Sequence, residues 1–233
     1  MGIVKTKGIV IAEHNVGDFD KILTILTPDL GKISCGAKGA RKPKTSLLAG
    51  TSFLSFSDYV LFKSPNSYNI NSCELIESFY NIRMDLDKLT YAANISKLIS
   101  SITNENDQSY RILQLYLNTL YLVSETEKDI KFIDSVFKIR LVCILGFTPI
   151  IKECMVCGEK EGQLYFSFKD SGVKCEDCGR QDKSAIKISQ GTFNALKYII
   201  LSPPKKIFSF EISEDGVKEL EIIAKIYLKD KLI

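Results

Sequence analysis

Hydrophobic and polar positions follow one pattern over residues 1 to about 78 and another over the rest of the chain. The first part contains short segments rich in Ile, Val, Phe, Tyr and Thr, separated by turn-prone pieces such as NVGD, TPDLG and SPNS. Such segments are typical of β-strands. We expect five strands, at residues 7–13, 20–26, 31–37, 53–63 and 67–77. Short strands so close together favour a small closed barrel, because closure removes exposed strand edges.

The fourth expected strand has apolar side chains on both faces. In the segment FLSFSDYVLF the alternation separates two sets: Leu54, Phe56, Val60 and Phe62 on one face, and Phe53, Tyr59 and Leu61 on the other. Aromatic side chains on the outside of a barrel can stack on nucleic-acid bases. They can equally pack beneath a loop or a neighbouring domain, so both interpretations stay open.

From about residue 83 to 147 the apolar residues recur at helical spacing. Residues 84–102 and 129–146 carry them three and four positions apart, with acidic residues in the first turn. Residues 109–125 are apolar nearly all round, which predicts a helix that is covered on several sides. Two more helices are expected near the carboxyl terminus, at 189–202 and 213–232.

Four of the seven cysteines form two closely spaced pairs. Two residues separate Cys154 from Cys157, and two residues separate Cys175 from Cys178. Seventeen residues lie between the two pairs. A two-residue gap lets both thiolates of a pair face one point, as tetrahedral zinc requires. A glycine follows each pair and permits a tight turn. With four sulfur ligands no open position remains, so we expect one structural Zn²⁺ per chain.

These patterns predict an α+β multidomain protein. It has an N-terminal five-stranded OB-type β-barrel and a central and C-terminal helical domain, into which a four-cysteine zinc knuckle is inserted. The expected domains are a nucleic-acid-binding barrel at 1–80, a helical bundle at 81–149, the zinc knuckle at 150–184, and C-terminal helices at 185–233 that pack on the bundle.

Composition adds limits rather than a function. The net charge is only +3, from 31 basic and 28 acidic side chains, so an anion site requires local sorting of charge. The start lacks the apolar core of a signal peptide, and we expect no membrane segment. The count of seven cysteines is odd, and Cys35, Cys73 and Cys143 stand singly. This favours reduced thiols and a cytoplasmic protein.

Catalytic motifs are missing from the sequence. His14 is the single histidine and lies in a turn-like segment, which excludes a histidine-based triad. The segment GKISCGAK resembles a phosphate-binding loop, but Ala37 stands where that motif needs lysine. Pairs such as Asp18 with Asp20 could bind magnesium, although such pairs are commonly solvated turn charges. We therefore expect a protein that is not an enzyme.

A basic segment between expected strands is the main candidate for binding a ligand. From Leu30 to Ser57 there is no carboxylate, and the cations are Lys32, Lys38, Arg41, Lys42 and Lys44. A solvated loop would explain such a run of charge. However, small barrels bind oligonucleotides through loops and strand faces, and the glycines here would let backbone amides approach phosphates. We therefore predict nucleic-acid binding with strong salt dependence.

Three segments resemble the RecO family of bacterial recombination mediators. They are GKISCGAKGARKPKTSL in the barrel, LGFTPIIKECMVCG before the first cysteine pair, and LYFSFKDSGVKCEDC at the second. The resemblance runs over essentially the whole chain, with one departure at Ser171, where family members often have glycine. It implies a repair protein, bacterial and associated with the nucleoid, that binds single- and double-stranded DNA and anneals complementary strands.

The resemblance also implies partners and site residues. The partners are RecR, the carboxyl-terminal tail of the single-strand binding protein and, indirectly, RecA. The DNA-binding residues implied are Lys32, Lys38, Arg41, Lys42 and Lys44, and the metal ligands are Cys154, Cys157, Cys175 and Cys178. For the tail peptide we consider Arg140 with Phe137 and Leu141, since an arginine beside an apolar groove suits an acidic peptide with apolar ends. An ion pair of Arg140 with a carboxylate at a domain junction is the other interpretation.

Two other functions remain compatible with the sequence. One is a zinc-containing adaptor that binds other proteins, with DNA binding incidental. The other is an RNA-binding factor stabilised by zinc.

Overall fold

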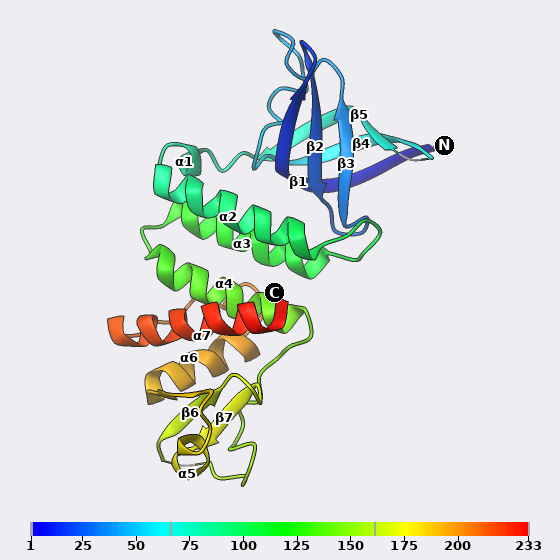
Figure 1. The fold of residues 1–233 in the computed structure, drawn as a ribbon. Helices are drawn as coiled ribbons and strands as arrows, with labels where there is room; N and C mark the ends of the chain where they lie inside the picture. The colour runs from blue at the N-terminus through cyan, green and yellow to red at the C-terminus, as the bar shows by residue number, and fades with distance from the viewer. Residues whose placement is uncertain (1, 66, 161, 233) are drawn as a thin grey trace. The chain divides into compact units, whose positions relative to one another are not determined.

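The computed structural model describes residues 2–65, 67–160 and 162–232. The chain forms two compact units, Met1–Glu125 and Thr126–Ile233. The first contains a β-barrel and three helices, and the second contains four helices and a small sheet (Figure 1). The division into four domains at 80, 149 and 184 stays a prediction.

The barrel of the first unit closes through all five of its strands. Their order is β1-β2-β3-β5-β4, and β1 pairs with both β2 and β4. The β3–β5 pair is parallel, whereas the other pairs are antiparallel. This arrangement confirms the predicted OB-type barrel. The strands are β1 (Gly2–Val16), β2 (Asp20–Leu26), β3 (Lys32–Ala37), β4 (Phe56–Ser64) and β5 (Ser67–Glu77).

Alternation along each strand fills the barrel interior. In β4, Tyr59 and Leu61 are fully buried, whereas Phe62 is 43% exposed on the outer wall. The prediction that Leu54 shares the face of Phe62 is wrong, because Leu54 is fully buried. The strand begins only at Phe56, and Leu54 lies in the preceding turn with a φ of 66°. A period of two holds only within the strand, so it does not extend to that turn.

Three helices complete the first unit: α1 (Tyr80–Arg83), α2 (Leu86–Ile102) and α3 (Tyr110–Glu125). Asp85 caps α2 by accepting hydrogen bonds from the backbone N–H groups of Asp87 and Lys88. The turn between α2 and α3 contacts the turn between β2 and β3. There Lys32 N–H donates to the carbonyl of Asn104 (3.0 Å), and Asn106 N–H donates to that of Leu30 (2.9 Å).

The second unit combines helices with a three-stranded sheet of order β7-β6-β8. Helix α7 packs along α4, and α6 contacts both. The short elements β7, β8 and α5 were not expected from the sequence. Among the described residues, no helix combines the length and the apolar character that crossing a bilayer requires. The elements are α4 (Ile130–Ile144), β6 (Leu164–Ser167), β7 (Gly172–Cys175), α5 (Glu176–Arg180), β8 (Ala185–Ile188), α6 (Gln190–Leu201) and α7 (Glu214–Leu232).

Candidate nucleic-acid interface and metal centre

Residues 38–55 connect β3 to β4, and we call them the basic loop. The loop rises from one end of the barrel (Figure 1). Four of its cationic side chains are exposed to solvent. In the described part of the chain no carboxylate forms an ion pair with them. These cations are Lys38, Arg41, Lys42 and Lys44.

Apolar anchors hold the basic loop against the barrel. Ala40 and Leu54 are fully buried and Leu47 is nearly so. Near the end of the loop, the buried hydroxyl of Tyr59 donates a hydrogen bond of 2.6 Å to the carbonyl of Gly50. The N–H of Leu54 donates to the carbonyl of Val10 in β1 (2.9 Å). The loop is therefore a packed part of the barrel, and its cations project from a fixed base.

The start of the loop contacts the turn between β1 and β2. Arg41 N–H donates to the carbonyl of Phe19 (2.9 Å), and its guanidinium Nη1 donates to that of Gly17 (3.4 Å). Gly39 N–H donates to a carboxylate oxygen of Asp20 (2.7 Å). The N–H groups of Gly39 and Arg41 are therefore engaged within the protein and are not available to a ligand. The segment from Leu30 to Ser57 contains no carboxylate, but folding brings Asp20 of β2 beside the loop.

Lys32 does not belong to this group of cations. It is the first residue of β3, and its ammonium donates a 2.5 Å hydrogen bond to the carbonyl of Ser100 in α2. The strand β3 is six residues long, and the basic loop begins directly after it at Lys38. At roughly 3.3 Å per residue, Lys32 lies about 20 Å from Lys38. The structure therefore brings together four of the five predicted DNA-binding residues.

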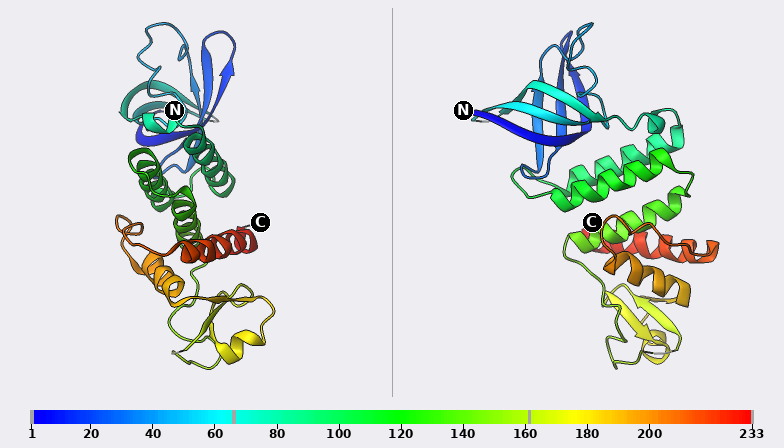
Figure 2. Two further views of the ribbon diagram at one scale, coloured as in Figure 1. Left: turned by 90° about the vertical axis from the view of Figure 1, so that its left-hand side faces the viewer. Right: turned by 180° about the vertical axis from the view of Figure 1, so that it is seen from behind.

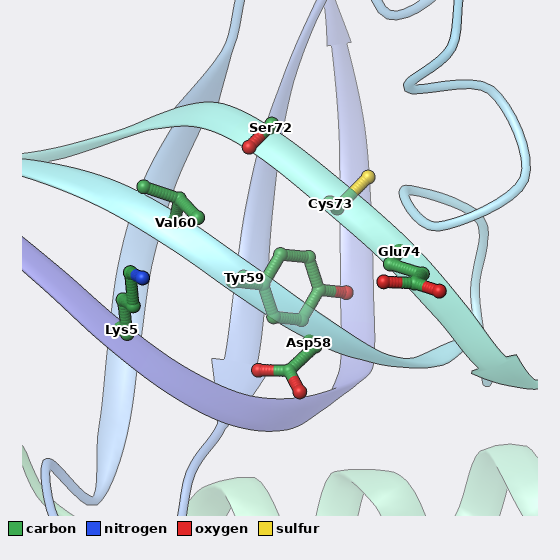
Figure 3. Close-up of a pocket in the computed structure, with 7 residues that line it drawn as sticks. All are labelled: Lys5, Asp58, Tyr59, Val60, Ser72, Cys73 and Glu74. Carbon is green, nitrogen blue, oxygen red and sulfur yellow. The ribbon is translucent and has the colours of Figure 1, made fainter.

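A shallow pocket of about 450 Å³ lies on the barrel wall formed by β1, β4 and β5 (Figure 3). Asp58 and Glu74 stand directly opposite each other in the β4–β5 register, and Lys5 is the cation of the lining. Two facing carboxylates repel a polyanion. This wall is thus a poor surface for nucleic acid, in contrast to the end of the barrel that carries the basic loop.

The four paired cysteines come together in the second unit. Their sulfur atoms all lie within 4.8 Å of one another, and the Sγ atoms of Cys157 and Cys175 are 3.6 Å apart. Tetrahedral zinc with Zn–S bonds of about 2.3 Å separates its sulfur ligands by about 3.8 Å. The cluster of Cys154, Cys157, Cys175 and Cys178 could therefore hold a metal ion, and its donor set fits zinc.

The backbone around Cys154 favours its thiolate form. Burial raises the pKa of Cys154, but hydrogen bonds from the backbone N–H groups of Cys157, Cys175 and Val156 outweigh it and lower the pKa to about 6. Thiolate is the form that binds metal. Gly158 closes the turn with a φ of 78°, and its N–H donates to the carbonyl of Cys154 (2.8 Å).

The two glycines that follow the cysteine pairs do different things. Gly158 supplies the predicted left-handed turn. Gly179 instead lies in α5, where an added Cβ would come within 2.5 Å of the Tyr165 ring, so it permits close packing rather than a turn. Ser171, the departure from the family pattern, has a φ of 58°, in the region that favours glycine. A glycine would adopt this conformation without the strain that the serine side chain adds.

A buried ion pair next to the cysteine cluster was missed from the sequence. The Lys174 ammonium is 2.5 Å from a carboxylate oxygen of Asp170 and 2.8 Å from one of Asp182. Hydrogen bonds from Lys174, Ser167 and Ser184 hold the pKa of Asp182 well below its usual range. In the sequence, Lys174 looks like an ordinary solvated lysine, so nothing there predicted that it is buried and paired with two carboxylates.

The residues considered for a partner peptide lie in the second unit. Phe137 and Leu141 are fully buried. The Nη1 atom of Arg140 donates to the carbonyls of Ile199 (3.0 Å) and Ile200 (2.6 Å), at the end of α6. These contacts are with carbonyl groups rather than with a carboxylate. The two apolar members thus offer no surface to a peptide in this conformation, and the peptide site stays a prediction.

An OB-type barrel with a cationic loop, followed by a helical unit that holds four clustered cysteines, defines a class of modular α+β proteins. Comparison with known families agrees with this class. Residues 1–79 match the family described as recombination protein O N terminal, and residues 83–232 match recombination protein O C terminal. The chain belongs to the RecO family.

Curated relatives resemble the chain over nearly its full length. The DNA repair protein RecO of Acetivibrio thermocellus is 46% identical over 233 residues, which cover 100% of this chain and 93% of the relative. The protein of the same name from Alkaliphilus metalliredigens is 34% identical, and the match covers 97% of this chain and 92% of the relative. The DNA repair protein RecO of a Thermoanaerobacter species is 32% identical, and the match covers 100% of this chain and 94% of the relative.

Proposed function

We propose that this chain is a DNA-binding recombination mediator in DNA repair. It binds single- and double-stranded DNA, anneals complementary strands and, with RecR, helps to load RecA onto strands coated by the single-strand binding protein. Membership in the RecO family supports the repair role. The observation that carries the DNA contact is the set of four exposed cations fixed at one end of the barrel.

The mechanism is charge neutralisation and positioning, without covalent chemistry. Lys38, Arg41, Lys42 and Lys44 hold the sugar-phosphate backbone and displace its counterions. Two strands held in this way repel each other less, so annealing is faster without nucleotide hydrolysis. The bound Zn²⁺, one per chain, is structural, since four thiolates complete its coordination and leave no position for a substrate.

The protein acts in the bacterial cytoplasm on DNA of the nucleoid. Its partners there are RecR, the tail of the single-strand binding protein and, indirectly, RecA. The tail peptide requires an exposed apolar surface beside a cation. We do not assign that surface to Phe137 and Leu141, since both are buried.

Salt dependence of DNA binding tests the proposal. Replacing the four loop cations by alanine should weaken binding to single and double strands of any sequence. The slope of log affinity against log salt should fall by about 2 to 3 units for single strands, because each lost phosphate contact removes about 0.7. A fluorescence anisotropy titration at several salt concentrations measures both quantities.

A charge-matched control makes the result specific. Alanine at four exposed lysines of the second unit (Lys169, Lys183, Lys187 and Lys225) changes the net charge equally. This variant should retain the full salt slope. An equal loss in both variants would show that the loop is not the contact, and tighter binding to RNA of the same sequence would favour an RNA-binding factor. Absence of any nucleic-acid binding would leave the adaptor function.

A further inference from the structure

An exposed aromatic ring stands beside the cations of the basic loop. Phe19 lies in the turn between β1 and β2, and its side chain is 46% exposed. Its carbonyl accepts the hydrogen bond from Arg41 N–H, which fixes this turn against the start of the loop. Figure 2 shows the turn and the basic loop at the same end of the barrel. A single exposed apolar residue is ordinary, but this one adjoins a concentration of positive charge.

Exposed apolar side chains also occur on β2, which follows the turn, and on the basic loop. Ile22 is 43% exposed on β2, and Leu48 of the basic loop is 51% exposed. Ile22 pairs with Gly36 of β3, which carries no side chain of its own. This wall therefore offers ring-sized apolar contact area next to the turn, which suits the faces of nucleotide bases.

Two acidic side chains at the turn favour one orientation of a bound strand. Asp20 accepts the N–H of Gly39, and Asp18 is exposed beside Phe19. Both carboxylates repel phosphate, while the four loop cations attract it. A strand bound here is therefore oriented with its phosphates along the lysines and its bases toward the turn. A duplex presents phosphates on its outside and keeps its bases stacked inside, so only a single strand can satisfy both sides.

We propose that Phe19 stacks on a base of single-stranded DNA and gives the barrel a preference for single strands over duplex. This inference rests on the proposed function, since it needs the basic loop to hold the backbone. Phe19 then supplies the base contact that the lysines cannot, because phosphate contacts do not distinguish the two forms. Stacking tolerates any base, so the preference is independent of sequence.

The absence of tryptophan from the sequence gives a direct test. Phe19→Trp introduces a single indole at the site, and an indole that stacks on a base loses fluorescence. Phe147→Trp is the matched control, because Phe147 of the second unit is 42% exposed. Each variant is titrated with labelled oligo-deoxythymidine and with a mixed-sequence duplex. Anisotropy of the label records binding, and tryptophan emission records stacking.

The expected result is quenching of the residue-19 variant by the single strand alone. The duplex should bind with little quenching, and the residue-147 variant should bind without quenching. Binding without quenching at position 19 would overturn the stacking role and leave the proposed function intact. Equal quenching at both positions would also overturn it. Failure of any variant to bind, with the unmodified protein equally inactive, would overturn both proposals.

Affinity measurements provide a second, independent readout. Phe19→Ala should weaken single-strand binding by about five- to a hundredfold, the range found for loss of one stacked base. Duplex affinity should stay the same, and Phe19→Tyr should restore single-strand binding. An equal loss for both forms of DNA would contradict the inference and indicate that the turn merely supports Arg41.

Discussion

At the scale of single residues, close backbone contacts decide which glycines matter. Gly31 and Gly17 both have left-handed backbones, with φ of 68° and 55°. An added Cβ at Gly31 would lie 2.0 Å from the carbonyl oxygen of Asn104, whereas nothing lies within 4 Å at Gly17. The two sites therefore separate the conformational cost of a side chain from its steric cost.

Gly31→Ala should destabilise the first unit by about 3 kcal/mol or more, because strain in φ is combined with a clash against backbone. Gly17→Ala should cost only about 1 kcal/mol, the price of the left-handed region alone. Urea unfolding monitored by circular dichroism measures both. Equal losses would show that the turn between α2 and α3 moves away readily, so that the contact of Gly31 with Asn104 is weak.

At the scale of elements, periodicity predicted the existence of the five barrel strands and the long helices, but β1 (Gly2–Val16) is longer than the expected 7–13 and β4 begins at Phe56 rather than at 53. The expected strand at 20–26 and the helices at 109–125 and 189–202 agree with β2, α3 and α6 within a residue. These elements have strong apolar repeats and definite boundary residues, such as Ser189, which caps α6. The strands β7 and β8 are four residues each, too short for a period to be recognised.

The candidate sites were predictable to a different extent. Cysteine spacing identified the cluster that could hold a metal ion, because the two cysteines of each pair are separated by only two residues. The prediction that groups Lys32 with the loop cations relied on proximity in the sequence, and it failed because β3 places Lys32 at the other end of the barrel. Proximity in the sequence also failed for Asp20 and Phe19, which come from a different hairpin. Contacts between distant segments depend on tertiary folding, so the sequence of a basic segment does not reveal which residues from other segments lie beside it.

The buried ion pair of the small sheet carries a prediction at this scale. Asp182→Asn removes one of two carboxylates that face the Lys174 ammonium, and Asp170 remains at 2.5 Å. We expect a loss of about 2 kcal/mol, typical of a weakened charged hydrogen bond. Asp215→Asn is the control, because its pair with Lys218 is exposed and should contribute nothing measurable. Chemical denaturation of the second unit gives both values.

The same variant has a defined pH dependence. The pKa of Asp182 is depressed by folding, so its contribution to stability is present above the pKa of an unfolded aspartate, about 4, and is lost as the pH falls. The difference in stability between the wild type and Asp182→Asn should therefore shrink progressively as the pH falls below about 4 toward the lowered pKa of the folded state. A constant difference down to pH 2 would mean that Asp182 acts through packing rather than charge.

At the scale of the whole molecule, the two candidate binding sites lie in different compact units. The described cations of the basic loop lie in the first unit, and the cysteine cluster lies in the second. Each unit has its own set of buried apolar residues. A ligand that binds only the folded form stabilises the unit that it binds. Metal and DNA should therefore protect separate parts of the chain.

Metal removal tests this separation. Hydrogen exchange measured by mass spectrometry reports on each unit, and a chelator should raise exchange at residues 151–180 by at least about tenfold, because a structural metal contributes folding free energy to the region it binds. Protection of β1 to β5 should not change, and an oligonucleotide should still protect the basic loop. The same chelator saturated with zinc is the control for non-specific effects. If chelation also exposed the barrel strands, or abolished protection of the basic loop, the metal would support the whole chain. The knuckle would then be part of the DNA-binding apparatus rather than a stabiliser of its own unit.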